Sequence, residues 1–301
     1  GGAKMGKIAF VFSGQGDQYP GMGKELAEKY PAAAQVFAVC DGIRPGTSEQ
    51  CFFGTEEELK ETANTQPCLF AMELAAAEVL SEKGVKPDAV AGFSLGEVTA
   101  VTFAGLVDKK TGFSLVCRRG ELMQREAEKF DTSMAAVVKL SDSQVEKICS
   151  KYEQIYPVNF NCPGQVTVSG LSEKMPEFFA EVKTAGGRAI PLKVKGAFHS
   201  PFMNAASADF KTELDKVAFS TPAVPVYSDM TAEVYGDNPA ELLSGQICSP
   251  VRWEKVIRGM IESGVDTFIE IGPGATLTNM IKKISGEVKA ITVTDYLKEA
   301  E

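Results

Sequence analysis

The sequence predicts an α/β fold with a smaller α+β unit inserted into a large core. Apolar, strand-like segments at 7–12, 88–92, 224–228, 266–271 and 289–293 alternate with helical patterns, which is typical of a sheet with helices on its faces. Residues 133–194 interrupt this alternation with the order β-α-β-β-α-β, the split unit of a ferredoxin-like subdomain. After the interruption the first pattern resumes, so the small unit lies inside the large one.

The core begins with the apolar strand 7–12 and a turn at 13–18 that contains two glycines. Helical patterns follow at about 21–40 and 66–83, and a short buried strand at 88–92 leads into a helix that begins at Glu97 and is apolar almost all round. A long helix is predicted over 109–129. Glu97 itself is expected to be an ordinary helix N-terminal charge.

The inserted unit is predicted to have strands at 133–140, 155–160, 165–169 and 188–194, with helices at 143–153 and 172–185. We therefore place the large core at 1–127 and 196–301 and the small subdomain at 128–195. In the last part of the core, the turn Gly272-Pro273-Gly274 leads into what we expect to be the final helix.

Composition places the chain among ordinary globular proteins, with 44% hydrophobic and 24% charged residues in a length of 301. No run of about 20 apolar residues predicts a membrane span, and no secretory signal pattern is present. Seven cysteines without a Cys-x-x-Cys pair, together with one histidine, argue against a disulfide framework and a zinc site. We expect a cytoplasmic protein without metal or cofactor, and the net charge of -9 disfavours nucleic acid as a partner.

The turn Gly92-Phe93-Ser94-Leu95-Gly96 joins a predicted strand to a predicted helix. Its Gly-x-Ser-x-Gly pattern fits a nucleophile elbow, in which glycines permit a sharp turn and the serine oxygen is exposed at a helix N-terminus. In such a turn the backbone N–H of Leu95 faces a developing oxyanion. The same pattern also occurs by chance with the serine merely capping a helix, and these residues alone leave both interpretations open.

His199 is the one histidine in the chain. A serine hydroxyl is a poor nucleophile until a base takes its proton, and imidazole is well matched to that role near neutral pH. If Ser94 reacts with the help of an imidazole, that imidazole belongs to His199.

Eight short segments spread over nearly the whole chain are distinctive: FSGQGDQYPGMG (12–23), TQP (65–67), GFSLGE (92–97), RRGELMQ (118–124), NCPGQVTVSG (161–170), GAFHSP (196–201), SPVRW (249–253) and EIGPG (270–274). In this order they resemble the signature segments of the malonyl-CoA:acyl-carrier-protein transacylases. The resemblance implies a hydrolase-like α/β core with an inserted ferredoxin-like α+β subdomain. The chain departs from the usual pattern at Ser13, Asp17 and Phe93, where Pro, Ser and His are common, and Phe93 leaves the nucleophile without a polar neighbour.

The resemblance implies that malonyl passes from malonyl-CoA to an ester on Ser94 and then to the phosphopantetheine thiol of acyl carrier protein, by a ping-pong mechanism that supplies fatty acid biosynthesis. His199 is implied as the base and later the acid, with the backbone carbonyl of Gln246 fixing its tautomer. The backbone N–H of Gln15 is implied as the second oxyanion donor. From spacing alone, Gln246 would be an ordinary helix-end residue.

Arg119 distinguishes this chain from a plain esterase. At helical spacing Phe113, Val116, Gly120 and Met123 form one packed face, which Arg119 flanks while Arg118 points almost opposite. A guanidinium beside a core needs an anion, and the free carboxylate of malonyl fits its bidentate fork. A structural salt bridge is the alternative, and the resemblance favours the malonyl clamp.

Four further residues are implied to line or support the acyl pocket: Phe198, Met123, Asn161 and Gln66. Phe198 fits the form of its segment in malonyl-selective members, where a bulky ring leaves no room for a methyl branch. Asn161 and Gln66 would equally serve as satisfied turn amides, and Lys195 is expected to be a solvated surface charge.

Two other functions share these features. A discrete acyltransferase serving a polyketide synthase would use the same residues, and a serine hydrolase of lipase or patatin type would share the elbow. A typical α/β hydrolase places its histidine after the last strands, whereas further strands follow His199. The expected partners are malonyl-CoA and an acidic holo acyl carrier protein that docks transiently, with a monomer as the default state.

Overall fold

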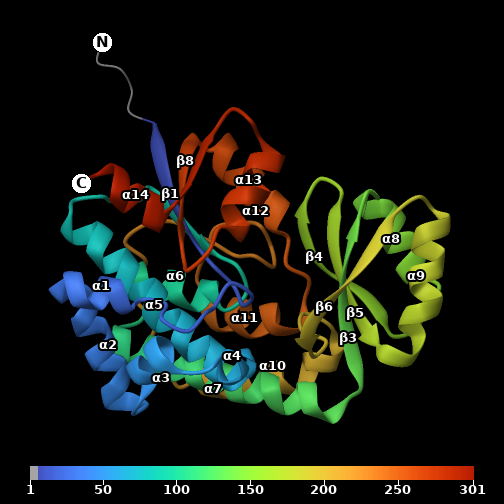
Figure 1. Cartoon of the computed structure of the whole chain (residues 1–301), viewed down its shortest axis with the longest axis horizontal. Helices are drawn as coiled ribbons and strands as arrows, with labels where there is room; N and C mark the ends of the chain where they lie inside the picture. Colours follow the sequence, from blue (N-terminus) through green and yellow to red (C-terminus); the bar gives the residue numbers. More distant parts are fainter. Residues whose placement is uncertain (1–5) are drawn as a thin grey trace.

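The computed structural model describes residues 6–301, and within them the strands form two sheets (Figure 1). The larger sheet has the order β7-β2-β1-β8-β9, and all its neighbouring strands run parallel. Its strands are β1 (Lys7–Phe12), β2 (Ala89–Gly92), β7 (Val226–Tyr227), β8 (Val265–Ile271) and β9 (Lys289–Thr292). The predicted α/β class is confirmed.

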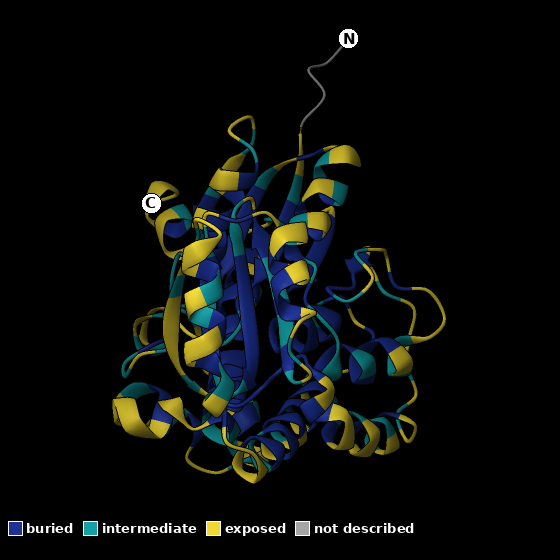
Figure 2. Ribbon diagram, turned by 90° about the vertical axis from the view of Figure 1, so that its right-hand side faces the viewer, coloured by how far each residue is buried: buried dark blue, intermediate teal, exposed yellow. Residues whose placement is uncertain are grey.

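Strand β1 shows why this sheet is covered on both faces. Its side chains alternate, so that Phe10 and Phe12 join one hydrophobic cluster while Ala9 and Val11 join another. The first cluster includes α5 (Thr62–Glu82), α6 (Gly96–Phe103) and α7 (Lys109–Lys129), and the second includes α12 (Trp253–Glu262) and α13 (Thr276–Ile284). Figure 2 shows buried segments in the interior and exposed surface on the outer sides of the helices.

The second sheet is antiparallel, with the order β4-β5-β3-β6. Its strands are β3 (Thr132–Val138), β4 (Ile155–Cys162), β5 (Gln165–Leu171) and β6 (Arg188–Lys195), and α8 (Asp142–Cys149) and α9 (Met175–Thr184) pack against it around a separate core. The chain order β-α-β-β-α-β is the predicted one. The domain boundaries at 127/128 and 195/196 stay a prediction, and α7 continues past the first of them to Lys129.

Several element assignments are corrected. The helix expected over 21–40 is two helices, α1 (Lys24–Lys29) and α2 (Pro31–Ile43), because Tyr30 precedes a proline and is extended. The strand expected over 224–228 is shorter, with β7 limited to Val226–Tyr227. The helix expected to be last is α13, and α14 (Val293–Glu299) follows it. Four further helices have no counterpart among the predicted elements: α3 (Thr47–Phe53), α4 (Glu56–Lys60), α10 (Asn204–Leu214) and α11 (Pro239–Gly245).

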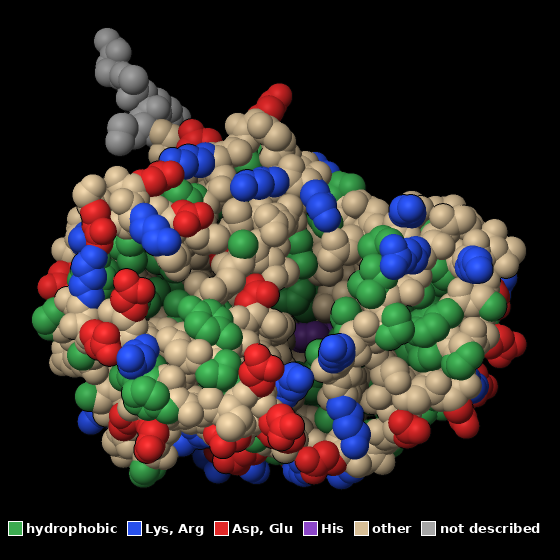
Figure 3. Space-filling model, viewed as in Figure 1, with side chains coloured by type: hydrophobic (Ala, Val, Ile, Leu, Met, Phe, Trp, Pro, Cys, Tyr) green, Lys and Arg blue, Asp and Glu red, His purple; other side chains and the backbone are tan. Residues whose placement is uncertain are grey.

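The topology places a cleft at the carboxyl ends of the parallel strands. The loops that follow β1, β2 and β8 lie side by side at this edge of the sheet. Because β2 and β8 flank β1 on opposite sides, the chain connections diverge there and leave a crevice. The small sheet faces these loops, with the Phe160 N–H donating to the Val251 carbonyl at 2.8 Å. The cleft between them has a volume of about 710 Å³. Figure 3 shows this hollow, with basic side chains at its rim and histidine at its bottom.

Candidate functional site

Ser94 lies in a sharp turn between β2 and α6, with a backbone φ of 56° that is uncommon outside glycine. The two flanking glycines are required sterically. A Cβ on Gly92 would lie 1.9 Å from the carbonyl carbon of Gly96, and one on Gly96 would lie 2.2 Å from the carbonyl oxygen of Phe12. The turn therefore has the geometry of a nucleophile elbow.

His199 completes a hydrogen-bonded relay with the serine. Its Nε2 lies 2.8 Å from Ser94 Oγ, and its Nδ1 lies 2.7 Å from the backbone carbonyl oxygen of Gln246. A carbonyl oxygen can only accept, so Nδ1 carries the proton and Nε2 is left free to accept from the serine. The backbone of His199 is also fixed, because its N–H donates to the Ile247 carbonyl at 3.0 Å.

The imidazole is poised as a neutral base. Burial lowers the pKa of His199 to about 4, and the positive charge of Arg119 adds to the effect, while the carbonyl of Gln246 opposes it. Neutral imidazole is thus the dominant form near neutral pH, which is the form that can take the serine proton.

Two backbone N–H groups, one in the elbow and one in the loop that approaches it at Phe93, have no hydrogen-bond acceptor within the described residues. Among the hydrogen bonds of residues 6–301, none is donated by the N–H of Leu95 or of Gln15. Gln15 belongs to the loop after β1, which lines the cleft, and Leu95 is the N-cap residue of α6. Free N–H groups at a helix N-terminus and a neighbouring loop are suited to bind an oxyanion.

Arg119 is fully buried on α7 and reaches the nucleophile. Its Nη2 donates to Gln246 Oε1 at 2.6 Å and to Ser94 Oγ at 3.3 Å, and its Nη1 donates to Gln66 Oε1 at 2.9 Å. Its Nε has no hydrogen-bond partner within the described residues. Burial lowers the pKa of Arg119 to about 10, which still leaves it charged near neutral pH. A buried cation with unused donor capacity beside the serine can bind an acyl group that carries an anion.

Two buried carboxyl groups that are not among the predicted site residues, those of Asp229 and Glu97, lie behind the nucleophile. Asp229 Oδ2 accepts the Ser94 N–H at 2.8 Å, and Asp229 Oδ1 accepts from Gln246 Nε2 at 3.0 Å. Glu97 Oε1 accepts the Asp229 N–H at 2.6 Å, while Tyr235 donates its hydroxyl to Glu97. The expectation of an ordinary helix-end charge at Glu97 is therefore wrong, because the side chain is fully buried in this network.

Signals for the pair were present in the sequence. Asp229 directly follows a predicted strand, and the carboxyl ends of parallel strands meet at the site edge of a sheet. Glu97 is a lone acid in a helix that is otherwise apolar almost all round, and a buried charge needs a partner.

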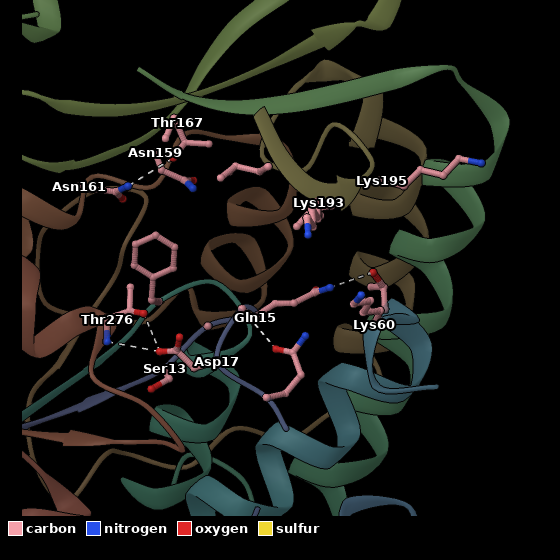
Figure 4. A pocket seen from close by; sticks show the side chains of 18 of the residues that line it. Ser13, Gln15, Asp17, Lys60, Asn159, Asn161, Thr167, Lys193, Lys195 and Thr276 are labelled. Atoms are coloured by element: carbon pink, nitrogen blue, oxygen red, sulfur yellow. Dashed lines mark hydrogen bonds between the residues drawn. The ribbon is translucent and has the colours of Figure 1, made fainter. Parts of the chain in front are cut away.

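The remaining predicted residues lie in two places. Gln66 and Met123 are buried beside Arg119, with Gln66 Nε2 3.3 Å from Met123 Sδ, and Phe198 is buried next to His199. Asn161 lies on β4 across the cleft, where it donates to Thr167 Oγ1 at 3.3 Å, as Figure 4 shows. Phe93, in place of the usual histidine, lines the cleft and packs edge-on against Trp253.

Lysines also line this cleft. Lys193 and Lys195 on β6 and Lys60 on α4 are exposed and belong to the cleft lining; in Figure 4 Lys193 points toward the cleft, whereas Lys195 extends away from it. The expectation of an exposed Lys195 is confirmed. The site as a whole combines an activated serine, free N–H donors, a buried cation and a basic entrance.

The pattern of the acyl transferase domain family matches residues 9–298. The malonyl CoA-acyl carrier protein transacylase of Bacillus subtilis is 39% identical over 300 residues, covering 97% of this chain and 94% of the relative. The transacylase of the same name from Escherichia coli K12 is 35% identical over 302 residues, covering 97% of each.

Solved structures agree in fold. An acyl carrier protein S-malonyltransferase from Vibrio cholerae superposes with a TM-score of 0.94 at 34% identity, covering 98% of this chain and 100% of that one. A malonyl-transacylase solved in complex with its type II PKS acyl-carrier protein has a TM-score of 0.93 at 33% identity, covering 97% and 99%. None of the helices within residues 6–301 combines the length and apolarity needed to cross a bilayer.

Proposed function

Since the chain belongs to the family of malonyl-CoA:acyl-carrier-protein transacylases, we propose that it loads malonyl from coenzyme A onto Ser94 and passes it to the thiol of acyl carrier protein for fatty acid synthesis. The observation that carries this proposal is the contact between Arg119 and Ser94. A buried cation 3.3 Å from the nucleophile's oxygen suits an acyl group with a free carboxylate, and a neutral ester has no anion for it to bind.

In the first half-reaction, His199 takes the proton of Ser94 while Oγ attacks the thioester carbonyl. The oxyanion that forms is bound by the N–H groups of Leu95 and Gln15. The carbon–sulfur bond then breaks, and His199 returns the proton to the coenzyme A sulfur. The second half-reaction reverses these steps with the carrier's thiol as nucleophile.

The test is a two-step transfer with purified components. Labelled malonyl should move from malonyl-CoA to the protein, and then to holo acyl carrier protein faster than to water. Rapid loss of the label to water, with none on the carrier, would instead support a serine hydrolase.

Replacing Arg119 by alanine is expected to lower kcat/KM for malonyl transfer about 10-fold to 150-fold more than for acetyl transfer, since one charge-assisted contact is worth roughly 1.5–3 kcal/mol. Only malonyl carries the anion, so the ratio of the two losses is the measurement. Loss of the contacts to Ser94 and Gln246 affects both acyl groups and cancels in that ratio.

Arg118→Ala is the matched control, because Arg118 is exposed and pairs with Glu121 on the surface of the same helix. It should change neither rate appreciably. Equal losses for malonyl and acetyl in Arg119→Ala would mean that Arg119 is structural.

We also propose a docking surface for the acidic carrier. Lys193, Lys195, Lys282 and Lys283 are exposed, the first two at the cleft and the last two on α13. In a protein of net charge -9, basic residues near the entrance would attract an acidic partner. We propose further that the protein is a cytoplasmic monomer and that its complex with the carrier is transient.

Charge reversal of Lys193 and Lys195 to glutamate is expected to raise KM for the carrier several-fold at low salt, and KM for malonyl-CoA less, because opposite charges speed encounter. The control is Lys216→Glu, an exposed lysine outside the cleft lining. Carrier kinetics insensitive to both salt and these reversals would show that docking occurs elsewhere.

A further inference from the structure

The buried groups behind Ser94 carry an unequal number of charges. Arg119, Asp229 and Glu97 are each 1% exposed or less, so one cation shares a dry region with two carboxyl groups. Gln246 links them, since its side chain accepts from Arg119 and donates to Asp229. Each change of charge here therefore acts on the others at short range and in a low dielectric.

The two carboxyl groups have different neighbours: Asp229 contacts the Ser94 N–H and the Gln246 amide, whereas Glu97 contacts the Asp229 N–H and the Tyr235 hydroxyl. Burial raises the pKa of Glu97 well above its ordinary value, and the nearby Asp229 raises it further, while the hydroxyl of Tyr235 and the charge of Arg119 oppose this. Burial also raises the pKa of Asp229, to about 7, against the Ser94 N–H, Arg119 and Gln246. Asp229 is thus the carboxyl group that Gln246 links to Arg119, and at slightly basic pH its anion balances the charge of Arg119.

A malonyl group loaded on Ser94 adds a negative charge to this buried group of residues. Its carboxylate on Arg119 would place a second anion near Asp229, and like charges in a buried site favour the neutral form of one of them. The carboxyl group of Glu97 lies behind the Asp229 backbone and makes no hydrogen bond to Arg119, Gln246 or Ser94 within the described residues, and burial together with Arg119 lowers the pKa of His199. Asp229 is therefore the group left to respond.

We propose that Asp229 takes up a proton from solvent when malonyl is loaded on Ser94, so that loading of a dicarboxylic acyl group is linked to pH. This inference rests on the proposed function. Asp229 acts as a positioning residue, since it holds the Ser94 N–H and the Gln246 amide and touches no reacting atom.

The proton is additional to those of acyl transfer. In loading, the thioester carbon–sulfur bond breaks, the Ser94 Oγ–carbon bond forms, and the serine proton passes through His199 to the coenzyme A sulfur. Transfer alone thus leaves the proton count unchanged while the released thiol stays protonated. A proton taken up on loading makes the loading equilibrium constant fall as pH rises, by up to about 10-fold per pH unit.

Proton uptake can be measured with a pH indicator in weak buffer at about pH 8, above the free-state pKa of Asp229. The uptake is divided by the amount of seryl ester found by intact mass. Loading from malonyl-CoA should take up to about one proton more from solvent, per ester formed, than loading from acetyl-CoA. Acetyl-CoA releases the same thiol without adding an anion to the site. At about pH 5.5 the difference should vanish, because Asp229 is then protonated before loading.

Two isosteric variants locate the proton. Asp229→Asn should lose the malonyl-specific uptake per ester, whereas Glu97→Gln should keep it because the Glu97 carboxyl contacts the Asp229 backbone and Tyr235 rather than Arg119 or Gln246. The single imidazole, followed by NMR, should stay neutral at about pH 8 in the loaded protein.

Equal uptake for malonyl and acetyl in the unmodified protein would overturn the inference without recourse to any variant. Retention of the uptake in Asp229→Asn, or protonation of His199 on loading, would also overturn it. Failure to form any seryl ester would be a different result, since it would contradict the proposed function itself.

Discussion

Malonyl-CoA is expected to add one malonyl group to this protein, on Ser94, and to leave the Ser94→Ala variant unmodified. Ser94 Oγ is the one nucleophile that the structure places against the imidazole, at 2.8 Å. Removing the nucleophile of such a relay lowers kcat by about 10⁴-fold to 10⁶-fold. Intact mass after mixing, followed by peptide mapping, measures both outcomes.

Cysteines are the competing nucleophiles in this experiment. Burial raises the pKa of Cys117 and of Cys149 to about 12, which keeps these thiols protonated and inert at neutral pH. Ser81→Ala, at an exposed serine, is the matched control and should label fully. Malonyl found on any cysteine would contradict the serine mechanism.

The parts of this site that sequence could predict are those encoded by local patterns. Gly92 and Gly96 predict the elbow because their spacing reflects close backbone approaches that any side chain would block. The helix predicted over 109–129 has these bounds in the structure, where its regular apolar spacing forms the packed face and the Asp108 side chain caps its first turn. These features depend on a few adjacent residues.

The buried carboxyl pair could not be predicted in the same way. Asp229 and Glu97 are 132 positions apart, and their contact depends on β7 and β2 being neighbours in the sheet. The contact of Gln246 with Arg119 is likewise set by tertiary packing, across 127 positions. The positions of Asp229 after a strand and of Glu97 in an apolar helix mark each residue separately, but strand order and amide orientation carry no local sequence signal, so their contact is seen only in the folded chain.

His199 is the group that we propose takes the serine proton, so its removal is expected to have a large effect on acylation. His199→Ala is expected to lower the acylation rate by about 10³-fold or more, because Arg119, a cation that cannot take a proton, is then the one remaining hydrogen-bond partner of Ser94 Oγ among residues 6–301. The fold should survive, as judged by circular dichroism, because the imidazole bonds one hydroxyl and one backbone carbonyl rather than filling the apolar core.

Because His199 is the one histidine in the sequence, its titration can be measured by NMR without assignment of other imidazole signals. An imidazole NMR titration of untagged protein should have a midpoint at about 4, and kcat/KM for acylation should rise through the same pH and then stay level, because only the neutral form accepts the serine proton. Arg119→Ala should raise that midpoint, since removing the nearby cation makes the charged imidazole less unfavourable. A kinetic midpoint well apart from the NMR midpoint, with chemistry rate-limiting, would mean that a different group activates Ser94.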